Sequence, residues 1–165
     1  MLLRSTQEVF SMEIRSYDSI KVGEKASFTK TVTETDIIQF AGISGDFNPV
    51  HINKEFAKNS MFKERIAHGI LTASFISAVA GTQLPGPNSI YLKQVLNFTA
   101  PVKIGDTITA TVEVISKRDD KHLITLDTTC TNQRGEKVIT GEALVKKPDW
   151  CPRPQKIHNC ITGGK

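Results

Sequence analysis

An aspartate and a histidine five residues apart could carry acid–base chemistry in this sequence. Asp46 and His51 belong to the segment Ser44-Gly-Asp-Phe-Asn-Pro-Val-His51, where Pro49 restricts the backbone and Asn48 can bond its own backbone and hold a turn. A carboxylate and an imidazole, with ordinary pKa values of about 3.9 and 6.5, can hold a water molecule, one accepting its proton and the other delivering a proton nearby. The same residues also fit an Asx turn that ends in a surface histidine. Both interpretations stay open from the spacing alone.

A second chemically useful segment is Ala67-His-Gly-Ile70, at the start of a predicted helix. Gly69 allows a ligand to approach the backbone closely, and the first turn of a helix presents free N–H groups with a partial positive charge. Such a helix start suits a carbonyl oxygen that gathers negative charge in a reaction. The alternative is an ordinary helix start with His68 as a polar cover. Ser77, two turns further on, is most simply a small residue for close packing.

The N-terminal third of the chain predicts the elements that position the first segment. Residues 26–32 alternate apolar and polar side chains, which is typical of a strand. Thr33-Glu-Thr-Asp36 resembles a capping box and leads into a short helix through Ala41. Residues 42–51 read as a loop, and Asn53 can cap a second short helix through Ala57.

A long apolar helix is predicted over residues 69–81, ended by Gly81 and the breaker Pro85-Gly-Pro87. Because it is apolar on every face, we expect it to be buried on every face. Its apolar stretch, residues 69–84, is too short to cross a membrane, which takes about 20 residues.

Four strands are predicted after this helix, joined by short connections as an antiparallel meander. They cover residues 90–98, in which Ile90, Leu92, Leu96 and Phe98 would share one face, and residues 107–114, 123–131 and 138–145. The resulting fold class is α+β: a single antiparallel sheet wrapped around one long central helix. Such a sheet leaves an edge strand bare, so we expect a homodimer formed by edge pairing, and higher assembly is compatible with it.

Composition limits the function classes. The 165 residues are 39% apolar and 23% charged, and 21 basic against 17 acidic side chains leave a net charge of +4. This mild, dispersed excess does not favour nucleic acid and suits an anionic small ligand equally well. We expect an extension over residues 1–19, one domain over 20–148 and a flexible tail over 149–165.

Three cysteines, and no secretory or membrane signal, favour a soluble protein of the cytoplasm. Cys151, His158 and Cys160 could be metal ligands, but no fourth ligand has regular spacing, so we expect simple thiols in the tail.

The segment Phe40-Ala-Gly-Ile-Ser-Gly-Asp-Phe-Asn-Pro-Val-His-Ile-Asn-Lys-Glu-Phe56 resembles the signature of the MaoC-like, hydratase 2 family of (R)-specific enoyl-CoA hydratases. Later blocks are also similar to that family: His68–Ala73, Leu84–Tyr91, Pro101–Asp106 and Gly141–Ala143. The resemblance covers residues 20–148 and implies the hot-dog fold, in which an antiparallel sheet wraps a long helix. It also implies reversible addition of water to a trans-2-enoyl-CoA, giving an (R)-3-hydroxyacyl-CoA.

The resemblance further implies roles for individual residues. Asp46 and His51 would be the catalytic pair, with Asp46 as base and His51 positioning the water and relaying the proton; the reverse assignment is open, because a coupled pair titrates as a unit. The backbone N–H of Gly69 would polarise the thioester carbonyl. Asn48 would hold the loop, and Ser77 would help to order the carboxylate.

No metal or redox cofactor is expected, since the thioester activates the alkene. The acyl chain should run along the central helix, which makes Ala80 and Val145 candidate walls. Lys93 or Lys103 could meet coenzyme A phosphates, although solvated surface lysines explain both equally well.

Three other functions remain open from the sequence. A dehydratase of 3-hydroxyacyl-[acyl-carrier-protein] would use the same residues in the reverse direction. A hot-dog acyl-CoA thioesterase would need a carboxylate on or near the central helix, and residues 69–81 contain none. A non-catalytic acyl-thioester binding subunit would need neither Asp46 nor His51, so the presence of the pair argues against it.

Overall fold

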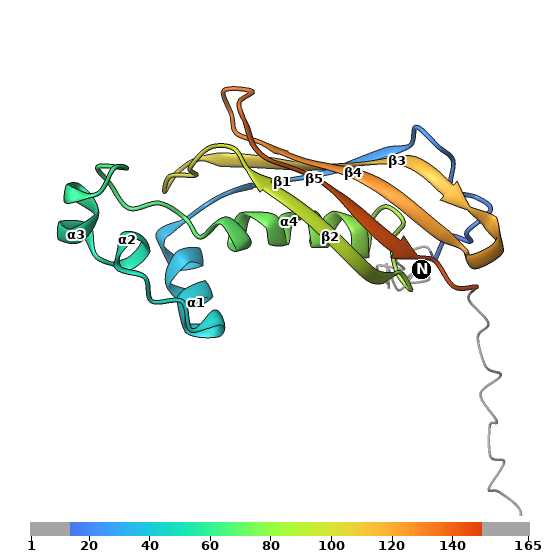
Figure 1. Cartoon of the computed structure of the whole chain (residues 1–165), viewed down its shortest axis with the longest axis horizontal. Coiled ribbons are helices and arrows are strands. Elements are labelled where there is room, and N and C mark those ends of the chain that lie inside the picture. Colours follow the sequence, from blue (N-terminus) through green and yellow to red (C-terminus); the bar gives the residue numbers. More distant parts are fainter. Residues whose placement is uncertain (1–13, 150–165) are drawn as a thin grey trace, which may run out of the picture.

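The computed structural model describes residues 14–149, and they form one antiparallel sheet with a long helix against it. Along the chain the elements are β1 (Lys25–Thr31), α1 (Glu34–Ser44), α2 (Pro49–Ile52), α3 (Lys54–Asn59), α4 (Gly69–Thr82), β2 (Ile90–Phe98), β3 (Thr107–Arg118), the 3-10 turn η1 (Asp119–Lys121), β4 (Leu123–Thr131) and β5 (Lys137–Lys146). Figure 1 shows α4 lying along one face of the curved sheet, with α1, α2 and α3 grouped beyond its N-terminal end. The predicted α+β class is confirmed.

The strand order is β1-β3-β4-β5-β2, and every neighbouring pair is antiparallel. The predicted meander is therefore confirmed for β3, β4 and β5 but is wrong for β2, which pairs with β5 instead of β3. The reason lies in residues 99–106, which do not form a tight turn. They form a crossing segment, which takes the chain from β2 at one edge of the sheet to β3 near the other edge. In this segment the carbonyl of Val102 accepts from the N–H of Ala67 at 2.7 Å, and that of Asp106 accepts from the N–H of Val32 at 2.8 Å.

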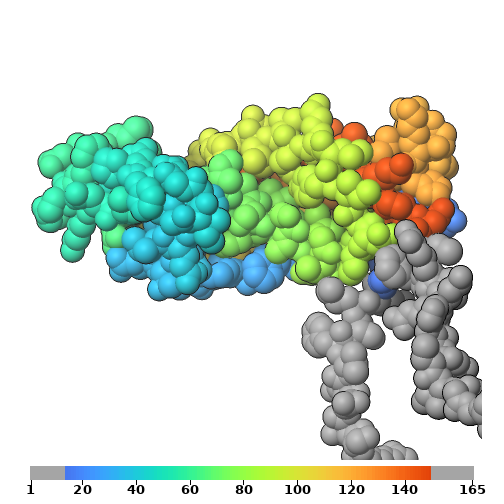
Figure 2. Space-filling view, turned by 90° about the horizontal axis from the view of Figure 1, so that it is seen from below, coloured from blue at the N-terminus to red at the C-terminus, as the bar shows by residue number. Residues whose placement is uncertain are grey.

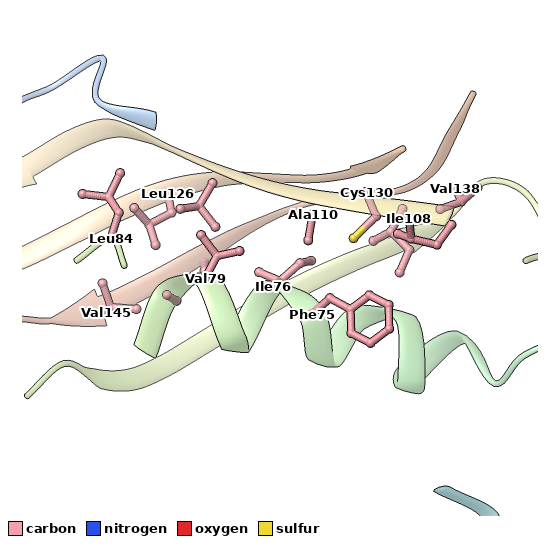
Figure 3. Close-up of a cluster of buried hydrophobic side chains, with 14 of the residues drawn as sticks. Phe75, Ile76, Val79, Leu84, Ile108, Ala110, Leu126, Cys130, Val138 and Val145 are labelled. Atoms are coloured by element: carbon pink, nitrogen blue, oxygen red, sulfur yellow. The ribbon is translucent and has the colours of Figure 1, made fainter. Parts of the chain in front are cut away.

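The core lies between the sheet and α4 (Figure 3). The predicted alternation of β3 is confirmed: its apolar residues from Ile108 to Val114 are fully buried, and the threonines between them are not. These side chains meet Ile76 and Val79 of α4 in one cluster. Because apolar burial is the main force that stabilises a domain, this contact fixes α4 on the sheet.

The predicted common face of β2 is wrong at its first residues. The register shifts between Tyr91 and Lys93. Ile90 lies opposite Lys146, whereas Leu96 lies opposite Gly141, which is on the other face of β5. Residues directly opposite each other in an antiparallel pair share a face. The extra residue of the bulge therefore turns Ile90 away from the face of Leu96.

Three short helices carry the loop of interest. The predicted capping box is confirmed, because Thr33 Oγ1 accepts from the N–H of Asp36 at 3.2 Å and Asp36 Oδ2 accepts from the N–H of Thr33 at 2.9 Å. Asn53 caps α3 as predicted. Residues 42–51 are not one loop, however: α1 continues to Ser44, and α2 begins at Pro49 because Asn48 caps it.

Helix α4 begins at Gly69 as predicted and ends one residue late, at Thr82. The expectation of burial on every side is wrong within this chain. The sheet covers one side of the helix only, so Ile70, Ser74 and Ser77 remain exposed. Figure 2 shows this uncovered side of α4 next to β2 on one surface of the molecule.

Several other expectations concern single residues and the chain ends. Cys130 is buried, and burial raises the pKa of its thiol to about 12. Cys151, His158 and Cys160 lie outside the described residues, as do most of the predicted extension and tail. Tyr17, which falls within the predicted extension over residues 1–19, belongs to the core. The limits of the domain stay a prediction. Within residues 14–149, no helix is long and apolar enough to cross a membrane.

Candidate active site

The loop between α1 and α2 is shaped by two consecutive side-chain turns. Gly45 ends α1 with a φ of +76°, a conformation that glycine adopts without strain. Asp46 Oδ1 then accepts from the N–H of Asn48 at 3.1 Å, and Asn48 Oδ1 accepts from the N–H of Val50 at 3.2 Å. These bonds hold Asp46 before α2 and His51 within it, so the Asx turn and the catalytic interpretation are compatible.

His51 is buried, with 8% of its surface exposed, and its Nδ1 lies 2.8 Å from the carbonyl oxygen of Ile66. A carbonyl can only accept, so Nδ1 carries the hydrogen and Nε2 of the neutral ring is a proton acceptor. Burial lowers the pKa of His51, and the nearby His68 lowers it further, against the raising effects of the Ile66 carbonyl and of Asp46. The ring is therefore neutral near pH 7 and ready to accept a proton.

Gly69 places the N-terminus of α4 at the same cavity as His51. The first N–H groups of a helix have no partner within it, and His68, the N-cap residue, provides no side-chain cap. A Cβ atom built on Gly69 would lie 2.6 Å from Cε1 of Phe98, which is closer than real contacts allow. Only glycine therefore fits here while the Phe98 ring stays in place.

His51 and Gly69 line one cavity of about 440 Å³. Its other walls are mostly apolar and come from the 62–67 segment, the start of α4, the end of β2 with the crossing segment, and β5: Phe62, Ile66, Ala67, Ile70, Thr72, Phe98, Thr99, Ala100, Pro101, Val102, Val138 and Ile139. An apolar cavity with a few polar groups at defined places is typical of a small-molecule site. An acyl chain can lie against these walls while its thioester carbonyl approaches the helix start.

The remaining site candidates lie elsewhere. Ser77 is exposed on the outer side of α4, and Ala80 and Val145 are almost fully buried in the core. None of these three is among the described residues that line the cavity. The structure thus brings Asp46, Asn48 and His51 together in one loop and turn, and His51 and Gly69 together at the cavity. Asp46 and Asn48 do not themselves line the cavity, and the other three candidates lie apart from both groups.

His68 joins this group unexpectedly. One polar atom each of Asp46, His51 and His68 lies within 4.8 Å of the others, a set that could in principle bind a metal ion. The two imidazole rings are tilted, with centroids 3.9 Å apart and planes inclined by 33°. A carboxylate beside two imidazoles also suits acid–base chemistry, in which one group accepts a proton and another delivers it.

Residues 18–135 match the MaoC-like domain family, and this range is well over half of the chain. The chain belongs to this family. It is 54% identical to an (R)-specific enoyl-CoA hydratase of Rhodospirillum rubrum over 132 residues, which cover 80% of this chain and 91% of that one.

Two solved structures resemble the MaoC-like domain closely. The (R)-hydratase of Aeromonas caviae involved in PHA biosynthesis has a TM-score of 0.77 at 46% identity, covering 79% of this chain and 98% of that one. The unliganded R-hydratase PhaJ1 of Pseudomonas aeruginosa has a TM-score of 0.77 at 41% identity, covering 90% and 96%. The predicted hot-dog fold is confirmed.

Sequence reasoning missed most walls of this MaoC-like site. Phe98 lies opposite Ile139 in the β2–β5 pairing, which the predicted meander did not contain. Thr99 to Val102 belong to the crossing segment that was taken for a short connection. The proline at 101 and the glycine at 105 were the signal for a longer, irregular path between β2 and β3.

Proposed function

We propose that this protein is an (R)-specific enoyl-CoA hydratase, which adds water reversibly to a trans-2-enoyl-CoA to give an (R)-3-hydroxyacyl-CoA. One observation carries the proposal: His51 and the free N-terminus of α4 line the same apolar cavity, and a carboxylate oxygen of Asp46 lies within 4.8 Å of a ring nitrogen of His51. The function named for the Rhodospirillum rubrum and Aeromonas caviae relatives agrees with it.

The reaction follows from these groups. A water molecule would donate its hydrogens to the Asp46 carboxylate and to Nε2 of His51. As its oxygen bonds to C3 of the enoyl group, the pair takes up one proton, and the electron pair of the C2–C3 double bond shifts toward the thioester oxygen. The N–H of Gly69 stabilises the negative charge on that oxygen.

The proton removed from water then returns to C2, so the pair ends in the state in which it began. Delivery from the same side as the hydroxyl gives syn addition, and the R configuration follows from the face of the alkene that the cavity presents. We keep Asp46 as base and His51 as the residue that positions the water and relays the proton. Because the two groups are coupled, this assignment describes the pair as a unit. No metal or redox cofactor is needed, since the thioester activates the alkene.

A hollow lined mainly by basic side chains, near the cavity, suits the phosphates of coenzyme A. Across the 62–66 segment lies a second hollow of about 260 Å³, lined by Lys54, Lys58, Lys63, Glu64, Arg65 and Ile104. Its excess of basic side chains attracts anions. Lys103, proposed from the sequence, is near the same segment, where its Nζ pairs with Glu64. The charge would equally attract an acidic carrier protein, so dehydration of 3-hydroxyacyl-[acyl-carrier-protein] is the alternative within this enzyme class.

A homodimer is also part of the proposal. The two edge strands of the sheet differ: the exposed Ser27 and Thr29 of β1 bond to hydroxyl groups of β3, whereas β2 exposes Tyr91, Leu92, Val95 and Phe98. The exposed Ile70 of α4 lines the same cavity as Phe98 of this second edge. Contiguous exposed apolar side chains mark an interaction surface, and a second copy pairing through β2 would cover them. We expect this dimer to act in the cytoplasm.

The deciding experiment mixes purified protein with crotonyl-CoA and follows loss of the enoyl absorbance and release of free thiol in parallel. We expect loss of the alkene without thiol, and at least a roughly 10²-fold lower kcat in Asp46→Asn. A chiral dehydrogenase coupled to the product checks the R configuration. Thiol release instead of alkene loss would indicate a thioesterase, and binding without turnover of either crotonyl carrier would indicate a binding subunit. The crotonyl ester of an acyl carrier protein, run at equal concentration, separates the two carriers.

A further inference from the structure

His68 contacts both members of the proposed catalytic pair. Its Nε2 lies 3.0 Å from the backbone oxygen of Asp46, and its ring centroid is 3.9 Å from that of His51. On its other side lies the Phe40 ring of α1, at 5.0 Å between centroids. The residue that follows it in the chain is Gly69. The His68 side chain therefore contacts the loop and the α2 histidine, and its backbone leads directly into α4.

The position of the hydrogen on the neutral His68 ring follows from these contacts. The carbonyl oxygen of Asp46 only accepts, so Nε2 must carry the hydrogen and donate it. In the neutral ring Nδ1 then has a free lone pair. Only 2% of the residue is exposed, and Nδ1 is buried with no hydrogen-bond partner among the described residues.

An unpartnered buried nitrogen is costly, and a phenylalanine would fill the same volume without that cost. A packing role alone does not explain an imidazole here. What the imidazole adds over a phenyl ring is the N–H that holds the Asp46 carbonyl. It also adds a ring that disfavours a proton on His51, since two charged imidazoles 3.9 Å apart would repel each other.

We propose that His68 is a positioning residue, which holds the Asp46 loop and the His51 ring in a fixed relation to the N–H of Gly69. The inference rests on the proposed hydratase function and adds a residue to which that function gives no role. The side chain acts through Asp46 and His51 and not on the substrate. Besides His68, Asp46 is the other titratable side chain that acts on the pKa of His51.

Two variants separate the contacts that His68 makes. His68→Phe keeps a ring against His51 and removes the donor to Asp46, whereas His68→Gln keeps an N–H donor and removes the ring. His122→Phe is the matched control, because His122 stacks on Tyr17 at 4.6 Å and lies outside the cavity lining. For each protein we would measure kcat and KM with crotonyl-CoA, the Tm, and the pKa of His51 by NMR titration.

We expect His68→Phe to lower kcat by roughly 10²-fold with little change in KM, because a displaced reacting pair loses alignment and not affinity. His68→Gln should recover a clear part of that loss, and both variants should raise the pKa of His51. His122→Phe should leave all of these values except the Tm unchanged. A folded His68→Phe protein with the parent's kcat would overturn the proposal, as would a loss of kcat that follows the Tm and is not recovered by glutamine.

Two further outcomes are also decisive. If His68→Phe does not fold, His68→Asn, whose shorter amide does not reach the Asp46 carbonyl, replaces it with the same expected loss of kcat. If the parent itself does not hydrate crotonyl-CoA, the proposed function fails, and the NMR titration still tests His68. A raised pKa of His51 in the His68 variants would then support the positioning contact, and an unchanged one would refute it.

Discussion

The two ends of α4 meet different surroundings. At the N-terminal end, Gly69 and Thr72 line the cavity, and the buried polar atoms without a described partner, His68 Nδ1 and Thr72 Oγ1, are both found there. At the C-terminal end, Val79 is enclosed by apolar side chains, among them Leu84, Leu126 and Val145. Figure 3 shows these last residues gathered over the second half of the helix.

This difference indicates how the domain divides its tasks. Among residues 14–149, no buried side-chain polar atom at the C-terminal, closed end lacks a hydrogen-bond partner, and this end contributes stability through apolar burial. The N-terminal, open end has two buried side-chain polar atoms with no partner among the same residues, which costs stability and is typical of functional sites. We therefore expect substitutions at one end to change activity and at the other to change the free energy of unfolding.

The largest expected effect is that of His51→Gln. Removing the imidazole should lower kcat for crotonyl-CoA hydration by about 10²- to 10⁴-fold, the range of general acid–base catalysis. The free energy of unfolding should fall by only about 1 kcal/mol, the worth of its bond to the Ile66 carbonyl. Stopped-flow absorbance and urea titration measure the two quantities on the same preparation. A variant with a near-parental rate would contradict the mechanism.

Leu126→Ala tests the opposite end. Leu126 is fully buried, and its truncation should lower the free energy of unfolding by about 2–5 kcal/mol through lost burial and a residual cavity. The kcat of the remaining folded protein should stay close to the parental value, because the side chain does not line the cavity. If kcat falls as far as in His51→Gln while the protein is folded, the two ends are not independent.

Gly69→Ala distinguishes the space around the helix start from its N–H group. Alanine keeps the N–H but its Cβ meets the Phe98 ring at 2.6 Å, so the ring or the helix must move. We expect kcat to fall about 10-fold from this displacement. The double variant with Phe98→Leu should recover most of the loss. A Gly69→Ala protein with the parental kcat would show that Phe98 moves aside freely.

How far the sequence predicted this division differs along the chain. The strong periodicity of β3 and the apolar run of α4 depend on local patterns. Helix α4 was predicted to within one residue, and β3 was predicted from its first residue but extends four residues further, to Arg118. The loop motif from Gly45 to His51 was identified by its resemblance to the hydratase 2 signature, because the spacing of Asp46 and His51 alone also fits an Asx turn. Its α2 turn was missed, since four residues give no periodicity to detect.

Long-range pairing accounts for the failures. Pro101 and Gly105 indicate an irregular path after β2, but no local pattern tells that β2 pairs with β5. The contacts of Phe98 with the Gly69 region therefore did not follow from the sequence. The uncovered side of α4 has the same cause, since only the path of the sheet decides which side of the helix is covered. His68 was seen as a helix start, and its role depends on the approach of Asp46 from 22 residues away.

The pH dependence should separate the two ends as well. Burial and His68 lower the pKa of His51 below its ordinary value of 6.5, so its neutral form persists into mildly acidic solution. The kcat/KM should hold at neutral pH and fall as pH drops through this lowered pKa. Over the same interval the unfolded state binds more protons than the folded one, so the free energy of unfolding also decreases as the pH decreases. The contribution of His51 to stability is complete above pH 6.5. In His51→Gln, rate and Tm profiles should lose both components, whereas Leu126→Ala should keep them.

The smallest expected effect concerns the length of the acyl chain. The sequence made Val145 a candidate wall, and a true wall should change the preference between acyl chains by roughly 10-fold or more for each methylene-sized change. Val145 is fully buried in the closed end and lies outside the cavity lining. We therefore expect Val145→Ala to change the ratio of kcat/KM for octenoyl-CoA and crotonyl-CoA by less than about 3-fold, which is below the change expected for a residue that lines the cavity.

Ile139→Ala, at a residue that does line the cavity, is the matched comparison and should change the ratio more. If instead the Val145 variant gains selectively on the longer substrate, the acyl chain reaches past the cavity along α4, and the closed end of the helix is part of the binding site.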